Sequence, residues 1–294
     1  MLRLLCSVTG VLLAVCLSVV PVYAQQDRAH QLAAQAANQV AVTCDNVSTL
    51  AGCHPSHLTG CSHAQHPRYD AYLNFLKNQH PARDLPPDRV LDLRDVIHLE
   101  EMIPAGMGRT NHADFAAGLA NIDGVGEGNI YAVVGYLYFV EDTAVTSHHR
   151  GETTNCQLQA NSTFDFHLGI GFDPVLAAQI RRNPPPHDPR NPGPPEQTSM
   201  VAEMTPHTRD SRWTVARLNR QRGKQVKVIG QLLLDNPHAN TREDCAFLGD
   251  PPQTCWRATI WEIHPVTQFF VCNTGRTCTA TSPDSDWTRL ENMP

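Results

Sequence analysis

The sequence predicts an α+β fold in which a small helical N-terminal region precedes a five-stranded, OB-like Greek-key β-barrel. Two observations carry this prediction. The second half of the chain contains five β-rich segments with one helical segment between the third and the fourth, which is the order such barrels need. The first and fourth segments contain Gly135 and Gly230, and glycine permits the strong coiling that closes a small barrel. A generic α+β domain is the alternative.

Short helices are expected before the barrel and within it. The first starts near Pro67, because apolar residues recur there at helical spacing. Two more are expected at residues 91–102 and 113–120. The helix between the third and fourth strands is expected at residues 211–222, where Gly223 is well placed to end it.

The predicted second strand, residues 162–172, has the clearest alternation in the chain. Every even-numbered position from Phe164 to Phe172 is apolar, so these side chains share one face, while Asp165 and His167 share the other. The other strands are expected at residues 130–140, 199–205, 226–235 and 258–264. Pro265, which has no donor for a sheet, follows the last strand, and residues 269–272 either extend or flank it.

The first 24 residues predict a signal peptide for export. Arg3 precedes a nearly unbroken apolar run, and Ala24 ends a small-residue pattern of the kind that signal peptidase reads. An uncleaved anchor is the alternative, but the run is short for a span of about 20 residues. We therefore expect a periplasmic or secreted protein whose mature chain has no transmembrane segment. The expected parts are a signal peptide (1–24), a Cys/His-rich loop with short helices (25–128), and the barrel domain (129–294) with a proline-rich insertion (183–196).

The cysteines of the mature chain are expected to form disulfides. An even number of cysteines in an exported protein is typical of a disulfide framework. They are Cys44, Cys53, Cys61, Cys156, Cys245, Cys255, Cys272 and Cys278. Local spacing favours Cys245 with Cys255 and Cys272 with Cys278, so that the other four would pair among themselves and tie the N-terminal segment to the later domain. A zinc site in the Cys/His-rich loop is the alternative.

Composition and motifs exclude several functions. The formal net charge is −6 and no strongly basic block occurs, which argues against nucleic acid as a partner. No nucleophile elbow, phosphate loop or dinucleotide fingerprint is present either.

Five polar side chains are expected to share one outward patch of the barrel. In an OB barrel the third strand lies between the second and the fifth, so residues of these three strands are neighbours. The five are Asp165, His167, Glu203, Glu262 and His264. Imidazoles and carboxylates suit a divalent metal such as zinc, and Asp235 and His238 are expected as hydrogen-bonding partners that orient such ligands. A hydrogen-bonded network without a metal and a metal-free ligand site are the alternatives.

Several segments between residues 129 and 272 form a distinctive set. They are 165–168 (DFHL), 201–203 (VAE), 226–230 (VKVIG) and 261–266 (WEIHPV), with Asp235 before His238 and Asn155 before Cys156. This set resembles a family of uncharacterised exported bacterial proteins with an OB-like β-barrel domain, which implies a fold and export but no activity. The strand order also resembles the thermonuclease family, but the second strand offers no arginine for that chemistry.

The functional expectation is an exported module that binds an unknown small molecule, an envelope component or a metal. One alternative is a metal-dependent hydrolase that acts at the five-residue patch, since a metal with an open position activates water. The other is a structural or protein-interaction domain, in which Asp165 and His167 would be buried under the N-terminal segment.

Overall fold

The computed structural model describes residues 47–53, 59–60, 70–142, 151–188, 191–248 and 254–293. The predicted signal peptide lies outside these residues, as do Cys44 and Cys61. Within the described residues, none of the helices has both the length and the apolar character that a membrane span requires.

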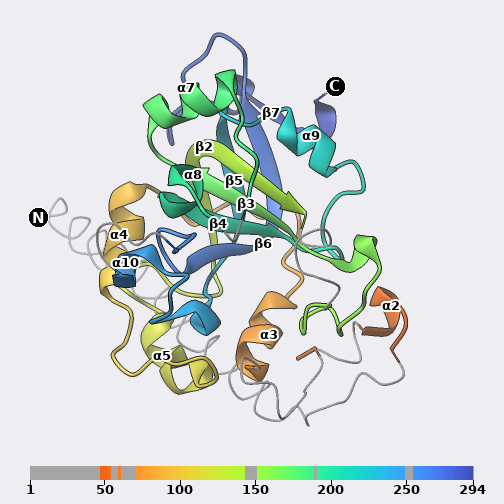
Figure 1. Cartoon of the computed structure of the whole chain (residues 1–294), viewed down its shortest axis with the longest axis vertical. Helices are drawn as coiled ribbons and strands as arrows, with labels where there is room; N and C mark the ends of the chain where they lie inside the picture. The colour runs from red at the N-terminus through yellow and green to blue at the C-terminus, as the bar shows by residue number, and fades with distance from the viewer. Residues whose placement is uncertain are drawn as a thin grey trace, which may run out of the picture.

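Five strands form a closed mixed β-barrel (Figure 1). They are β2 (Ile130–Asp142), β3 (Phe166–Gly171), β4 (Ser199–Met204), β5 (Gln225–Leu234) and β6 (Trp261–Cys272). Antiparallel pairs join β2 to β3, β3 to β4, and β6 to β5, while β4 and β6 run parallel. A further antiparallel pair between β5 and β2 closes the barrel.

Short elements surround the barrel. Two further strands extend the sheet: β1 (Val90–Leu91) pairs with β2, and β7 (Trp287–Arg289) pairs with β6. The α-helices are α2 (Leu50–Cys53), α3 (Ala71–Lys77), α4 (Leu93–Glu101), α5 (Ala116–Leu119), α7 (Pro174–Arg182), α8 (Pro194–Gln197), α9 (Val215–Asn219) and α10 (Cys245–Leu248). The 3-10 turns are η1 (His112–Phe115), η2 (Asn161–Thr163), η3 (Asn236–His238), η4 (Asp284–Asp286) and η5 (Leu290–Asn292). Figure 1 shows α3 and α5 at one end of the barrel and α7 and α9 at the other.

Alternation along the strands fills the barrel interior with apolar side chains. On β3, Leu168 and Ile170 are buried in the main core, together with Met200 of β4 and Ile263 of β6. Asp165 precedes this strand and faces the opposite way, as the period of two requires. The expected split between an apolar and a polar face of this strand is therefore present.

One element differs from expectation, and one alternative is decided. The helix predicted at 211–222 is shorter: α9 begins after Thr214, whose side chain accepts a hydrogen bond from the Arg217 amide and caps the helix. Residues 269–272, expected either to extend or to flank the last strand, extend it, so that β6 continues past Pro265 to Cys272. Pro265 is tolerated because the register between β5 and β6 shifts at Gly230, so the missing donor falls in an irregular part of the ladder.

Three disulfides are present among the described residues, and each agrees with the expected pattern. Cys245 pairs with Cys255, and Cys272 pairs with Cys278. The third joins Cys53 to Cys156 across 103 positions of sequence, so it ties the N-terminal segment to the chain that enters β3.

His112 provides a second tie between the helical region and the barrel. Its ring is fully buried, with Nε2 2.9 Å from both carboxylate oxygens of Glu127 and Nδ1 2.9 Å from the Asn236 side-chain oxygen. Burial disfavours the charged imidazole, but the Glu127 carboxylate outweighs burial and raises the pKa of His112.

The contribution of the His112 contacts to the stability of the fold is expected to depend on pH. Because the folded pKa of His112 lies above its unfolded value of about 6.5, protonation stabilises the fold fully below that pH, and the contribution is lost as pH rises through the folded pKa. His112→Gln should therefore lower the free energy of unfolding more at about pH 5.5 than at about pH 9, as urea denaturation would measure. An equal loss at both values would contradict this assignment.

Candidate functional site

The pairing of β3, β4 and β6 brings the five predicted polar side chains together. His167 and Glu203 are direct cross-strand partners, and the parallel pairing of β4 with β6 places Glu262 beside Val201. His264 follows two residues later on the same face of β6. We call this group, together with the charged side chains that contact it, the charged cluster.

The charged cluster is buried. An outward patch was expected, and burial of Asp165 and His167 under the N-terminal segment was the expectation of the structural alternative. Asp165, Glu203, Glu262 and His264 expose at most 4% of their surface, and only His167 is half-buried. The strands do turn these side chains away from the barrel interior. However, α3, residues 151–154 and the chain around Trp256 line the space above them, so the face is covered. An outward side chain on a barrel is exposed only where no other segment packs against it.

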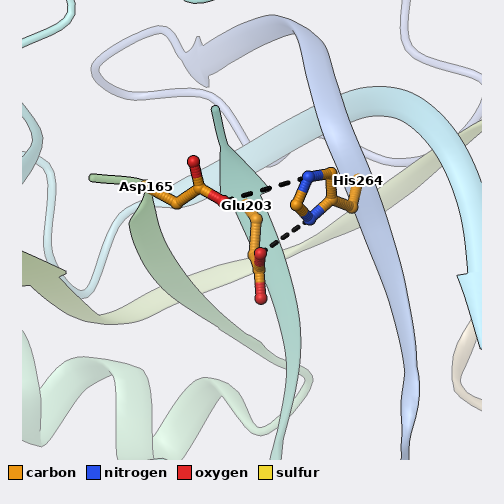
Figure 2. Close-up of side chains that lie close together, drawn as sticks. All are labelled: Asp165, Glu203 and His264. Atoms are coloured by element: carbon orange, nitrogen blue, oxygen red, sulfur yellow. Dashed lines mark ion pairs between the residues drawn. The ribbon is translucent and has the colours of Figure 1, made fainter. Parts of the chain in front are cut away.

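Glu203 lies at the centre of the cluster. Its two oxygens lie 3.1 Å from His167 Nε2 and 2.6 Å from His264 Nδ1. The other nitrogen of His264, Nε2, faces Asp165 Oδ2 at 3.9 Å (Figure 2). That separation is too long for a hydrogen bond. Asp165, Glu203 and His264 each offer one ligand atom, and the three atoms lie within 4.8 Å of one another.

Lys77, the last residue of α3, enters the cluster from the N-terminal region. Its ammonium nitrogen lies 2.9 Å from Glu262, 3.3 Å from Asp235 and 3.8 Å from Glu203. These three carboxylates form a second group with metal-like spacing, and Lys77 already supplies the cation. Lys77 was not predicted from the sequence, because a lysine in the last turn of a short helix ordinarily points to solvent.

Asp235 and His238, predicted as orienting partners, do join the cluster. Asp235 Oδ2 accepts from Arg257 Nη1 at 3.0 Å and lies 3.0 Å from His238 Nε2. Arg257 is 1% exposed and also reaches Glu262 at 3.4 Å. Arg257 was not predicted either, since it precedes β6 and no periodic pattern marks it.

Two residues before β3 surround Asp165. The Asn155 side-chain amide donates to Asp165 Oδ1 at 3.1 Å and to Glu152 at 2.6 Å. A Glu152 oxygen in turn accepts from the Asp165 backbone amide at 3.2 Å. Burial, reinforced by the negative charge of Asp165, raises the pKa of Glu152 to about 8, so this carboxyl is largely protonated at neutral pH.

Opposite charges dominate the protonation of the remaining groups. Burial disfavours ionisation of each, yet the carboxylates hold the pKa of Lys77 and of His167 well above their ordinary values. Burial lowers the pKa of His264, but Glu203 outweighs it and raises the value to about 9. Burial likewise raises the pKa of Glu203, while His167 and Lys77 outweigh it and hold the value well below 4.5.

A cavity of about 310 Å³ opens above the cluster. Lys77, Glu152, His167 and Glu203 lie in its wall, together with Trp256. The Trp256 ring lies near two imidazoles, with ring centroids 6.5 Å from His167 and 5.5 Å from His238. The arrangement therefore combines an aromatic face, donors and acceptors in a space large enough for a small ligand.

No protein-family model matches the chain, no curated protein matches its sequence, and no solved structure matches it. The site must therefore be interpreted from its own residues. Two arrangements fit them: a network of ion pairs that needs no ligand, and a metal centre between Asp165 and His264.

Proposed function

We propose that the protein is an exported, OB-like module that binds one divalent metal ion, such as zinc, between Asp165 and His264, with Glu203 orienting the imidazole. The observation that carries the proposal is the pair of contacts made by His264: a carboxylate 2.6 Å from Nδ1 and another 3.9 Å from Nε2.

The His264 contacts suit a metal centre better than a simple ion pair. Metal-binding histidines usually present one nitrogen to the ion while a carboxylate holds the other. Glu203 is placed to hold Nδ1, which leaves Nε2 and Asp165 Oδ2 to face each other. Two ligand atoms that are each about 2.1 Å from one zinc ion lie at most about 4.2 Å apart, so a separation of 3.9 Å is compatible with a shared ion.

The chemistry of the two side chains also favours a cation at this position. A mixed imidazole and carboxylate set is typical of zinc, and with open positions also of manganese or iron. Since binding must release the proton of His264, affinity is expected to increase with pH.

The strand order supports the OB-like part of the proposal. The sequence β2-β3-β4-β6-β5 closes on itself, with β4 parallel to β6 and α9 between β4 and β5. Three disulfides support export to an oxidising compartment, in agreement with the signal peptide expected at residues 1–24.

Metal analysis of the purified protein tests the proposal. We expect about one equivalent of bound metal per chain after incubation with Zn²⁺ or Mn²⁺ and gel filtration at about pH 8. His264→Ala and Asp165→Asn should each weaken binding by about 10- to 100-fold or more in calorimetric titrations, because each removes a ligand.

A matched control separates this site from general surface binding. His98 is 44% exposed and pairs with Asp123, so His98→Ala removes a histidine and an ion pair away from the cluster. It should leave metal affinity unchanged. The proposal would be contradicted if the protein binds substoichiometric metal and neither His264→Ala nor Asp165→Asn reduces that amount. This result would favour the ligand-free network.

The cavity favours a second candidate, a metal-dependent hydrolase. It leaves room for a small substrate beside the proposed ion, where a bound water could be activated. This candidate predicts turnover of a phosphodiester, ester or peptide that a chelator abolishes and Zn²⁺ or Mn²⁺ restores. A broad substrate panel without chelator-sensitive turnover, from protein shown to contain metal, would leave a binding module.

A further inference from the structure

A second cavity, of about 570 Å³, lies beside α4 and shares no lining residue with the cavity of the charged cluster. Its walls come from α4 and the loop that follows it, from β4, and from two segments, 239–246 and 258–260. This volume falls within the range of small-molecule sites, about 300–1,000 Å³. The proposed metal function does not use this cavity, so the two sites can be tested separately.

One face of α4 forms an apolar side of the cavity. Leu93, Val96 and Ile97 follow one another at the spacing that places side chains on the same face of a helix. Val96 is buried, whereas Leu93 and Ile97 are 47% and 49% exposed. Met200 and Ile260 are buried and complete the apolar wall. A single exposed apolar side chain needs no explanation, but two at the edge of an apolar cavity are typical of a ligand site.

The protein itself compensates the two acidic side chains of this wall that are not exposed, Glu100 and Asp244. Glu100 Oε2 accepts hydrogen bonds from the Thr259 hydroxyl and, at 3.1 Å, from the Ile260 amide. Asp244 pairs through its backbone with Arg257. Burial raises the pKa of Glu100 to about 7, while the Thr259 hydrogen bond and the positive charge of Arg257 oppose that increase. Neither acid therefore requires a cationic ligand.

Glu100 retains one oxygen that a ligand can use. Both of its hydrogen bonds to described residues are accepted by Oε2, and none of these residues donates to Oε1. Glu100 follows Leu93 by seven positions, so it lies on the same face of α4 as the apolar side chains. A carboxyl oxygen accepts a hydrogen bond from a hydroxyl group. The cavity thus combines a long apolar contact with a single polar one.

We propose that this cavity binds an uncharged, mainly apolar molecule with one hydroxyl group, such as a long-chain alcohol, with the hydroxyl at Glu100 and the hydrocarbon along α4. A carboxylate ligand would lie beside two acids. An ammonium ligand would lose its hydration to reach carboxyls that the protein already compensates. A protein partner would suit a flat apolar patch, whereas Leu93 and Ile97 border a cavity with buried walls.

Calorimetric titrations of the protein at about pH 8 with four probes test the proposal. The probes are 1-hexanol, 1-octanol, octanoate and n-octylammonium. We expect 1-octanol to bind about tenfold more tightly than 1-hexanol, because two more methylene groups are buried. It should also bind at least about tenfold more tightly than octanoate, and at least as tightly as octylammonium, since the cavity favours neither charge.

A pair of matched variants locates the binding. Ile97→Ser alters an exposed side chain, so the fold should persist, and it should weaken 1-octanol binding by several-fold. Val175 is 64% exposed on α7 and does not line the cavity, so Val175→Ser should leave the affinity unchanged.

A third variant tests the role of charge. Glu100→Gln keeps a group that hydrogen-bonds to a hydroxyl, so 1-octanol affinity should change by less than about threefold. Octanoate should bind several-fold more tightly to Glu100→Gln than to the wild type, because one negative charge is removed from the wall. If this variant fails to fold, the four probes and the two serine variants still decide the question.

Several results would overturn the proposal. They are octylammonium binding tenfold more tightly than 1-octanol, equal affinities for 1-octanol and octanoate, and 1-octanol binding that is absent or that Ile97→Ser does not weaken. A dimer of the wild type that Ile97→Ser dissociates, measured by analytical ultracentrifugation, would instead assign this face to a second copy of the chain.

Discussion

Lys77→Met is expected to lower the free energy of unfolding by about 3–5 kcal/mol, because removal of one partner of a buried ion pair leaves the other charge uncompensated. The Lys77 side chain is 11% exposed, and its ammonium is the shared counter-charge of Glu203, Asp235 and Glu262. Methionine keeps most of the apolar stem and removes the charge alone. Urea denaturation of the wild type and the variant at neutral pH would measure the loss.

An exposed ion pair provides the control for Lys77. Arg89 and Asp95 pair at the surface with side chains 41% and 25% exposed, so Arg89→Met should cost at most about 1 kcal/mol. Similar small losses for Arg89→Met and Lys77→Met would contradict the view that the charged cluster stabilises the contact between α3 and the barrel.

The same variant bears on metal binding. Without Lys77, three carboxylates with metal-like spacing lose the one cation that pairs with all three, while Arg257 still pairs with Asp235 and Glu262. We expect Lys77→Met to bind one more equivalent of Mn²⁺ than the wild type, and Mn²⁺ to restore part of its stability by mass action. If Mn²⁺ does not increase the free energy of unfolding of Lys77→Met, the three carboxylates cannot contract around an ion.

Local patterns in the sequence were sufficient to predict the barrel strands and the gathering of polar side chains. The period of two at residues 162–172 places Asp165 and His167 on one face, and the order of the strands makes β3, β4 and β6 neighbours. The two short-range disulfides also follow from spacing. In each case the information lies within one strand or one loop.

The choice between an outward and a buried patch, and the cations of the patch, could not be predicted in this way. Lys77 and Arg257 lie far from Glu203 in the sequence and reach the cluster only because α3 and the segment before β6 pack over the barrel. No periodicity in either segment encodes that contact. The extension of β6 past Pro265 likewise depends on a register shift relative to β5, which is a property of the pair of strands rather than of one segment.

Removal of the Cys53–Cys156 disulfide is the other change with a large expected effect. A crosslink stabilises a fold mainly by restricting the unfolded chain, and a loop of roughly 100 residues corresponds to about 4.7 kcal/mol in the chain-entropy relation. The bond spans 103 positions. We expect Cys53→Ser combined with Cys156→Ser to lower the free energy of unfolding by about 2–5 kcal/mol in urea denaturation without reductant.

The Cys272–Cys278 bond gives the matched comparison, because it spans only 6 positions. Its double serine variant should cost about 2 kcal/mol by the same relation. The two variants should also differ at the site. Cys156 directly follows Asn155, whose side chain holds Asp165, so loss of the Cys53 bond should weaken metal binding, whereas loss of the Cys272 bond should not. Equal effects of the two variants on both stability and metal affinity would mean that the long-range crosslink does not position the residues before β3.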